Sequence, residues 1–302
     1  MTSGSIWKQM TFFAMPIFLG NLFQQLYNTV DSLIVGNFLG SSALAAVSSS
    51  GSLIFMLIGF LSGISAGAGV IVARFFGAGD EKNLQRAVHT TVAFGLVAGV
   101  LMTGVGVALS PQILRWMDTP ESVMRESVTY LQIYFAGSLG FVMYNVLVGI
   151  LQAVGDSRHP LYYLIVSSVI NLVLDLLFIT GFHTGVGGAA VATVISQIVS
   201  ALLCFWQLLR TKESYGLKIR KIRFDKGILV QIIKIGLPSG VQNSIIAFAN
   251  VIVQSNINAF GEMAMAGYGA YTKVEGFGFL PINSFTMALT TFVGQNLGAK
   301  QE

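Results

Sequence analysis

Cysteine and charge are what this sequence has least of. Cys204 is the only cysteine among 302 residues, which excludes an intrachain disulfide and a cysteine-based metal cluster. Only 10% of the residues are charged, whereas soluble domains average about 25%. We also expect no cleavable signal peptide, because the first apolar run is too long for one and carries polar residues. Since 54% of the residues are hydrophobic, we do not expect a soluble domain.

Long apolar runs fill the chain instead. A helix of about 20 apolar residues crosses a bilayer, and eight runs reach that length: 11–36, 46–73, 88–110, 127–153, 160–181, 187–209, 230–258 and 265–295. Several are long enough to predict tilted or kinked helices. The polar stretch Ser110–Arg125 between two of them predicts a short helix at the membrane surface. We therefore predict an all-α membrane protein with eight spans.

The basic residues are distributed unevenly about these spans. If the spans alternate in direction, 13 of the 17 Lys and Arg residues fall on one side, and only Arg115 and Arg125 fall on the other. Lys and Arg accumulate in cytoplasmic loops, so we expect a cytoplasmic N-terminus. The net charge of +4 follows from this pattern and does not indicate nucleic-acid binding.

The sequence contains an internal repeat. Pro16, Asn21 and Asn28 match Pro238, Asn243 and Asn250 at an offset of 222. After a one-residue gap, the matches continue at an offset of 221: Gly40, Ala43, Ala45, Gly77 and Ala78 with Gly261, Ala264, Ala266, Gly298 and Ala299. Six spans lie within this offset. Because six is even, the two copies are predicted to enter the membrane in the same direction, as parallel repeats do.

The repeat predicts two lobes. Residues 1–210 form a six-helix lobe, residues 211–228 form a basic cytoplasmic linker, and residues 229–302 form the first two spans of a second lobe. A second lobe of equal size would need four more spans, so we expect a C-terminally incomplete bundle with eight of twelve spans. The linker either is solvated or lies on anionic lipid headgroups.

The first span carries a polar stripe at three- and four-residue steps, formed by Asn21, Gln24, Gln25, Asn28, Asp31 and Ser32. Such a stripe must face protein or a water-filled cavity, because a carboxylate in lipid is costly. The second copy keeps Asn243 and Asn250 and adds Gln254, but Val253 stands where the first copy has Asp31. We expect the first lobe to carry the ionisable chemistry.

A second acid lies in the fifth span. Asn171 and Asp175 share one helical face there, and Thr193 supplies a hydroxyl in the sixth span. Two carboxylates with an amide and a hydroxyl suit a hard cation or a transferable proton. The alternative is that these groups only hydrogen-bond the helices to one another.

Another acid, Glu275, lies in the eighth span, two residues after Lys273. It either faces a central cavity, where it would attract cationic substrates, or makes a structural pair. The candidates for a substrate cavity are Gln24, Asn28, Asn243, Asn250, Gln254 and Glu275.

The segment Gly63–Gly67 matches the G-x-S-x-G motif of serine hydrolases. That motif needs a strand–turn–helix elbow and a histidine partner. Here it lies inside an apolar run rich in small residues, which is typical of helix packing. We expect no enzyme activity and no cofactor.

Four segments together resemble the multidrug and toxic compound extrusion (MATE) family: MPIFLGNLFQQLYNTVDSLIVG, ARFFGAGDEKNLQRAV, ILQAVGDSRHPLYYLIVSSVINLVLDLLFI and GVGGAAVATVISQ. The resemblance covers the whole chain. It implies a bundle of twelve spans in two lobes, and a cation site in the first lobe at Asp31, Asn171, Asp175 and Thr193. Na⁺, if it is the coupling ion, would be held by these four residues.

The resemblance also implies a function. Members export small organic compounds, often cationic or amphiphilic, in exchange for H⁺ or Na⁺. We expect a monomer in the lipid of the bacterial cytoplasmic membrane that works by alternating access. A flippase of lipid-linked precursors is the alternative, but its cavity would be expected to carry several Lys or Arg residues to meet pyrophosphate.

Overall fold

The computed structural model of the protein describes residues 1–2, 4–117, 119–258, 260 and 262–301. Within these ranges, some helical side chains lie outside the description: those of residues 41–42, 44–46, 48–53, 55–58, 251, 254–255, 258, 262–266, 269–270 and 272–273. The predicted cavity residue Gln254 falls in this second group, as does Lys273, which precedes Glu275 by two residues.

The described part of the chain is helical and contains no strand, which confirms the all-α prediction. The α-helices are α1 (Ile6–Leu39), α2 (Ser41–Gly77), α3 (Glu81–Trp116), α4 (Glu121–Ala136), α5 (Ser138–Ala153), α6 (Arg158–Leu176), α7 (Val186–Arg210), α8 (Lys226–Asn258) and α9 (Glu262–Gly298). A π-helical turn, η1 (Leu177–Gly181), continues α6. A short 3-10 helix, η2 (Ile219–Lys221), lies between α7 and α8.

Six segments of the described helices are long and apolar enough to cross a membrane, or seven if α4 and α5, which meet at 49°, form one bent span. The expected count of eight is therefore not confirmed. The helix α1 is not among the six, because its polar stripe lowers its hydropathy. The predicted surface helix at Ser110–Arg125 is wrong. Its first half completes α3 and its second half begins α4, since the buried Leu114 packs the last turns of α3 into the core.

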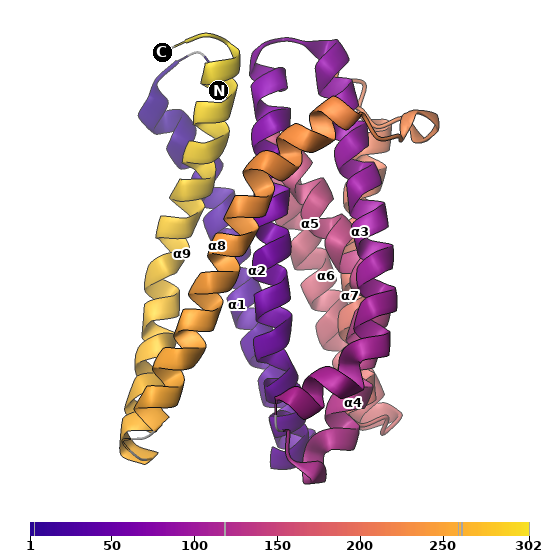
Figure 1. Ribbon diagram of the computed structural model, residues 1–302, viewed down its shortest axis with the longest axis vertical. Coiled ribbons are helices and arrows are strands. Elements are labelled where there is room, and N and C mark those ends of the chain that lie inside the picture. Colours follow the sequence, from indigo (N-terminus) through magenta and orange to yellow (C-terminus); the bar gives the residue numbers. More distant parts are fainter. Residues whose placement is uncertain (3, 118, 259, 261, 302) are drawn as a thin grey trace.

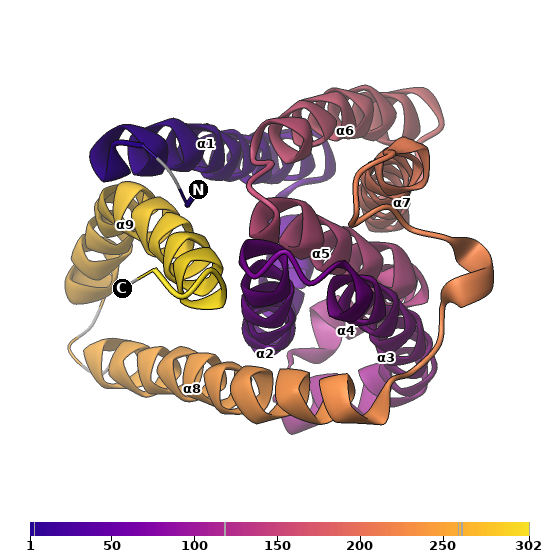
Figure 2. The ribbon, with the colours of Figure 1, turned by 90° about the horizontal axis from the view of Figure 1, so that it is seen from above.

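The helices form one bundle with a hairpin along its side. Seen from above, α1, α6 and α7 form one row, and α2, α5, α4 and α3 fill the middle (Figure 2). The hairpin of α8 and α9 packs on this bundle, α8 against α2 and α9 against both α1 and α2. Both ends of the chain and the linker between α7 and α8 lie at the same end of the molecule (Figure 1), called here the terminal end.

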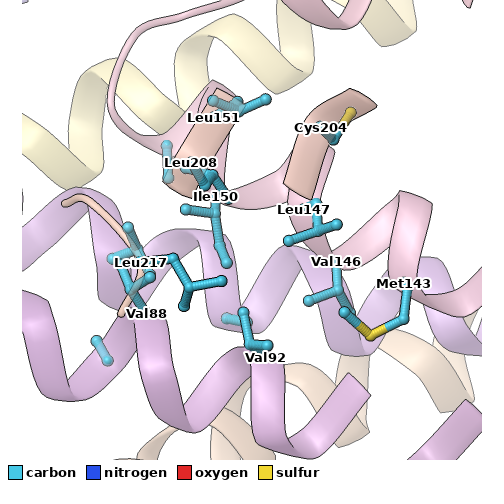
Figure 3. Close-up of a cluster of buried hydrophobic side chains, with 14 of the residues drawn as sticks. Val88, Val92, Met143, Val146, Leu147, Ile150, Leu151, Cys204, Leu208 and Leu217 are labelled. Carbon is cyan, nitrogen blue, oxygen red and sulfur yellow. The ribbon is translucent and has the colours of Figure 1, made fainter. Parts of the chain in front are cut away.

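The largest apolar cluster lies toward the terminal end and joins α2, α3, α5 and α7. It includes Val88 and Val92 from α3, Ile150 and Leu151 from α5, and Leu208 from α7 (Figure 3). Leu217 of the linker belongs to the same cluster and is 3% exposed. The linker is thus anchored in the core of the bundle.

Glycines allow α2 and α8 to pack backbone against backbone. A Cβ atom on Gly63 would lie 2.2 Å from the backbone nitrogen of Gly240, and one on Gly67 would lie 2.4 Å from that of Gly236. The G-x-S-x-G match is therefore part of a helix-packing surface inside α2, as its small residues predicted.

The two repeats also meet closely at the terminal end. There, Cβ atoms on Gly77 of α2 and Gly298 of α9 would collide with the opposite backbone. Toward the other end, α8 and α9 lie apart from α1 and α4 (Figure 1), and Val274 and Phe260 are 74% and 81% exposed. The arrangement is closed at the terminal end and splayed at the opposite one.

Candidate functional site

Three helices bring together the four residues predicted to hold a cation. Asp31 comes from α1, Asn171 and Asp175 lie one turn apart on α6, and Thr193 lies on α7. The helix α6 packs against both α1 and α7. Asn171 is 1% exposed and Asp175 is fully buried, so these two α6 side chains lie inside the bundle.

The amide of Asn171 connects α6 to α7. Oriented so that both of its polar atoms are satisfied, its Nδ2 donates to Asp175 Oδ2 at 2.8 Å and its Oδ1 accepts from the backbone N–H of Thr193 at 3.2 Å. Thr193 Oγ1 donates to the carbonyl of Ala189 at 3.1 Å. Asn171 thereby fixes the position of the Asp175 carboxyl group relative to α7.

The carboxyl groups of Asp31 and Asp175 are in hydrogen-bonding contact. An ionised carboxylate can only accept, so a hydrogen bond between two carboxyl groups needs one of them to carry a proton. Asp31 Oδ1 and Asp175 Oδ1 are both buried and make no hydrogen bond. One proton shared by the pair can bind α1 to α6, and the two oxygens without a hydrogen bond can contact a cation.

Tyrosines surround this pair, and the sequence analysis missed them. The hydroxyl of Tyr27 is in hydrogen-bonding contact with the side chain of Thr193. The rings of Tyr130 and Tyr134 on α4 stack with centroids 6.5 Å apart. Tyr27 lies four residues before Asp31, on the same helical face, and that spacing was the available signal. Tyr130 and Tyr134 gave no such signal in the sequence, because they approach the carboxyl pair from another helix.

A π-helical turn begins two residues after Asp175. In η1, the N–H of Phe182 donates to the carbonyl of Leu177 at 3.0 Å, a step of five residues. Single π-turns within α-helices occur frequently at functional sites. This irregularity lies directly beside the carboxyl pair.

The predicted cavity residues do not form one cluster. Asn243 donates to the carbonyl of Gly59 on α2 at 3.0 Å, so it joins two helices. Glu275 accepts from the hydroxyl of Tyr271 on its own helix at 2.8 Å. Asn28 and Asn250 are exposed, and Gln24 is partly buried.

Carboxylate clusters of the kind that hold transition metals do not occur in the described residues, where no group of three or more His, Cys, Asp or Glu could bind a metal ion. A cation at the site would be held by the two carboxyl groups with amide and hydroxyl oxygens. Such an oxygen-only set suits H⁺ or a hard cation such as Na⁺.

The chain is similar to known proteins over almost all of its length. The profile of the MatE family matches residues 16–177 and 238–302. These two blocks begin at Pro16 and Pro238, the first matched pair of the internal repeat. The chain is 34% identical to "Probable multidrug resistance protein YoeA" of Bacillus subtilis, with 98% of this chain and 66% of that protein covered. It is 32% identical to "Probable multidrug resistance protein YpnP" of the same organism, with 100% and 67% covered.

Solved structures give the same result. A structure described as the "outward-facing conformation of a multidrug resistance MATE family transporter of the MOP superfamily" superposes with a TM-score of 0.92 at 27% identity. The match covers 99% of this chain and 66% of that one. The chain thus spans about two thirds of the length of the relatives that it matches.

Proposed function

Because the chain belongs to the MatE family of transporters, we propose that it takes part in cation-coupled export of small organic compounds. The single observation that carries this proposal is the carboxyl pair between α1 and α6, formed by the partly buried Asp31 and the fully buried Asp175. Buried acids in membrane spans are expensive and usually serve transport.

The coupling step follows from the chemistry of the pair. With one proton between them, the two carboxyl groups attract, and α1 stays against α6. Without it they repel, unless a cation such as Na⁺ replaces the proton. Binding and release of the ion therefore change how α1 packs on α6. The direct hydrogen bond between the acids favours H⁺ as the coupling ion.

This change reaches the contact between the repeats through α1. Asn21 lies ten residues before Asp31, about 15 Å along the helix, and its Nδ2 donates to Ser284 Oγ on α9 at 3.2 Å. A shift of α1 at the carboxyl pair acts on this bond. An ion whose affinity differs between the closed and open arrangements shifts the equilibrium between them. Alternating access results when the same shift opens the terminal end.

The remaining features of the proposal are those expected of an exporter. Residues 1–210 form one lobe, residues 211–228 form a cytoplasmic linker, and residues 229–302 belong to a second lobe. The N-terminus lies in the cytoplasm of a bacterial cell, and the protein acts in the cytoplasmic membrane as a monomer. The substrates are drugs, as the names of the relatives suggest, and the family resemblance implies organic cations or amphiphiles among them. Gln24, Asn28, Asn243, Asn250, Gln254 and Glu275 are the candidates for contact with them.

The test is ethidium efflux from cells that express the protein, under an imposed H⁺ or Na⁺ gradient. Asp31→Asn and Asp175→Asn should each abolish gradient-driven efflux. Glu213→Gln, which also neutralises one carboxylate but in the exposed linker, should leave it intact. The gradient that drives efflux identifies the ion.

Unchanged efflux in either aspartate variant would refute the coupling role of the pair. Absence of efflux by the wild type under both gradients would refute drug export, and would favour the flippase alternative.

A further inference from the structure

A basic cavity of about 680 Å³ lies at the terminal end, between the start of α3 and the linker that joins α7 to α8. It is separate from the carboxyl pair, and neither the coupling ion nor the drug substrate of the proposed function accounts for it. Five basic side chains line it: Lys82, Arg86, Arg220, Lys221 and Arg223.

The backbone of the cavity wall is fixed by buried polar groups of α3. His89 Nε2 accepts from the N–H of Lys218 at 3.0 Å, and Thr90 Oγ1 accepts from the N–H of Asp225 at 3.0 Å. Gln85 Nε2 donates to the carbonyl of Gly216 at 3.0 Å. His89 and Thr90 are 3% and 0% exposed. The linker is therefore held in place against α3 on both sides of the basic stretch.

Acidic side chains neutralise only part of this surface. Of the two carboxylates that line the cavity, Asp225 is already engaged: its Oδ1 accepts from the N–H of Ile228 at 3.1 Å, and its Oδ2 lies 3.7 Å from Arg86. Glu81 is the other. Within the described residues, no ion pair is found for Lys82, Arg220, Lys221 or Arg223. The five basic side chains around the cavity thus outnumber its two carboxylates.

Apolar side chains beside the basic ones point to the kind of anion. Ile219 and Phe224 flank the basic stretch and are 61% and 47% exposed. The stretch lies where the apolar helices α3 and α8 begin, at the place where a membrane surface would meet the bundle. Basic residues that alternate with exposed apolar ones are typical of segments on anionic lipid. A soluble phosphate would make no apolar contact with Ile219 or Phe224, whereas the acyl chains of a lipid would.

We infer that this cavity binds the phosphate headgroup of an anionic phospholipid, with Arg220, Lys221 and Arg223 from the linker and Lys82 and Arg86 from α3 around it. Guanidinium and ammonium groups together suit a phosphate, because arginine can donate two parallel hydrogen bonds to it. The bound lipid holds the linker against α3. It therefore restrains the connection between the two repeats.

The test is native mass spectrometry of the purified protein with phosphatidylglycerol or phosphatidylcholine in the detergent. The wild type should retain phosphatidylglycerol in preference to phosphatidylcholine. The variant Arg220→Gln/Lys221→Gln/Arg223→Gln should lose affinity for phosphatidylglycerol by about a hundredfold, since each basic residue near anionic lipid contributes substantially. The variant Arg220→Lys/Arg223→Lys keeps the charge and should retain most of the binding.

The matched control is Lys212→Gln/Lys218→Gln/Lys226→Gln, which removes the same charge from the same part of the chain outside the cavity lining. It should bind phosphatidylglycerol like the wild type. Equal loss in both triple variants, or no lipid preference in the wild type, would overturn the inference. If inorganic phosphate displaces the lipid at millimolar concentration, or stabilises the protein as well as the lipid does, the site is one for soluble anions and the lipid assignment is wrong.

Discussion

Asn21 on α1 and Asn243 on α8 occupy the same position in the internal repeat, and each donates a hydrogen bond to the second helix of the other repeat. Asn21 Nδ2 donates to Ser284 Oγ on α9 at 3.2 Å. Asn243 Nδ2 donates to the carbonyl of Gly59 on α2 at 3.0 Å. The two repeats thus hold one another through a reciprocal pair of amides.

The acceptors of these two bonds are related as well. Ser284 Oγ in turn donates a hydrogen bond to the carbonyl of Leu280 at 2.7 Å. Leu280 matches Gly59 at the repeat offset of 221. Ser284 in turn matches Gly63. Where glycine lets α2 and α8 approach closely, the amide bonds the carbonyl directly. Where α1 and α9 meet, the serine hydroxyl bridges amide and carbonyl.

Removing either amide should loosen the contact between the repeats. We expect Asn21→Ala and Asn243→Ala each to lower the free energy of unfolding by about 0.6 kcal/mol, the average for polar contacts between membrane helices. Thermal unfolding in detergent measures the effect. The control is Asn256→Ala, because exposed Asn256 donates only to the carbonyl of Ile252 on its own helix. Equal shifts in all three variants would show that the bonds across the repeats contribute nothing specific.

The glycine contact should tolerate no added atom. In Gly63→Ala the new Cβ would lie 2.2 Å from the nitrogen of Gly240, and overpacking of this kind costs about 1–3 kcal/mol of stability. In Gly104→Ala on α3 the Cβ would meet no atom within 4 Å. That control should be neutral or slightly stabilising, because alanine favours helix over glycine. Thermal unfolding in detergent measures both variants. A Gly63→Ala variant as stable as the wild type would contradict the close packing of α2 on α8.

The fold could be predicted from the sequence where the signal is local or periodic. Apolar runs gave the helices, and matched residues such as Pro16 and Pro238 gave the repeat, which the two blocks of the family match support. The count of spans was not confirmed at α1, because its polar stripe makes it less apolar than a lipid-facing helix. That same stripe identified Asp31.

The candidate site was predictable in part for the same reason. Asn171 and Asp175 are one turn apart, so their shared face follows from helix geometry. Their contact with Asp31 and Thr193 depends on how three helices pack, which only the family resemblance suggested. Gln295 and Ser284 escaped notice because they bond residues distant in sequence. The role of the site in coupling stays a prediction.

Gln295 shows what such a contact contributes. Its side chain is fully buried on α9, and its Nε2 donates to the carbonyl of Ala153, the last residue of α5, at 2.7 Å. The last carbonyls of a helix lack partners within it, so an amide from the second repeat caps a helix of the first. Its Oε1 accepts from the amino group of Met1 at 2.8 Å.

Gln295→Met keeps the size of this side chain and removes both bonds. The carbonyl of Ala153 would stay buried without its partner, which costs about 1–3 kcal/mol. Chemical unfolding in detergent should show this loss. Gln301→Met offers a control, because Gln301 is exposed at the end of the same chain segment. A loss of similar size in both variants would contradict the capping role of Gln295.

Two neighbouring threonines test the attachment of the linker. Thr90 Oγ1 bonds the backbone of Asp225 and Arg223, at 3.0 and 3.4 Å, whereas the buried Oγ1 of Thr91 makes no hydrogen bond. Thr90→Val should therefore speed tryptic cleavage after Arg220 by about fivefold, the effect of losing about 1 kcal/mol of hydrogen bonding. Thr91→Val makes the same chemical change one residue away and should leave the cleavage rate unaltered. Equal rates in the two variants would show that Thr90 does not hold the linker.

The start of α3 should respond to acid only at low pH. Asp80 accepts from the backbone N–H of Asn83 at 3.1 Å and from its side-chain amide at 2.6 Å, and these bonds hold the pKa of the Asp80 carboxyl below its ordinary value. Since the folded pKa is lowered, the cap is fully present above the pKa of the unfolded chain. It is lost as the pH falls below about 4.

Hydrogen exchange of the amides in the first turn of α3 measures this. Protection should be constant between pH 7 and pH 5, after correction for intrinsic exchange, and should fall below about pH 4. Asp80→Asn keeps an oxygen acceptor but cannot titrate, so its protection should not change with pH. A decline above pH 5 in the wild type, or the same decline in Asp80→Asn, would mean that some other group controls this turn. Because the turn carries Lys82 of the basic cavity, its fraying also removes part of the cavity wall, so lipid retention by the wild type should fall over the same pH range.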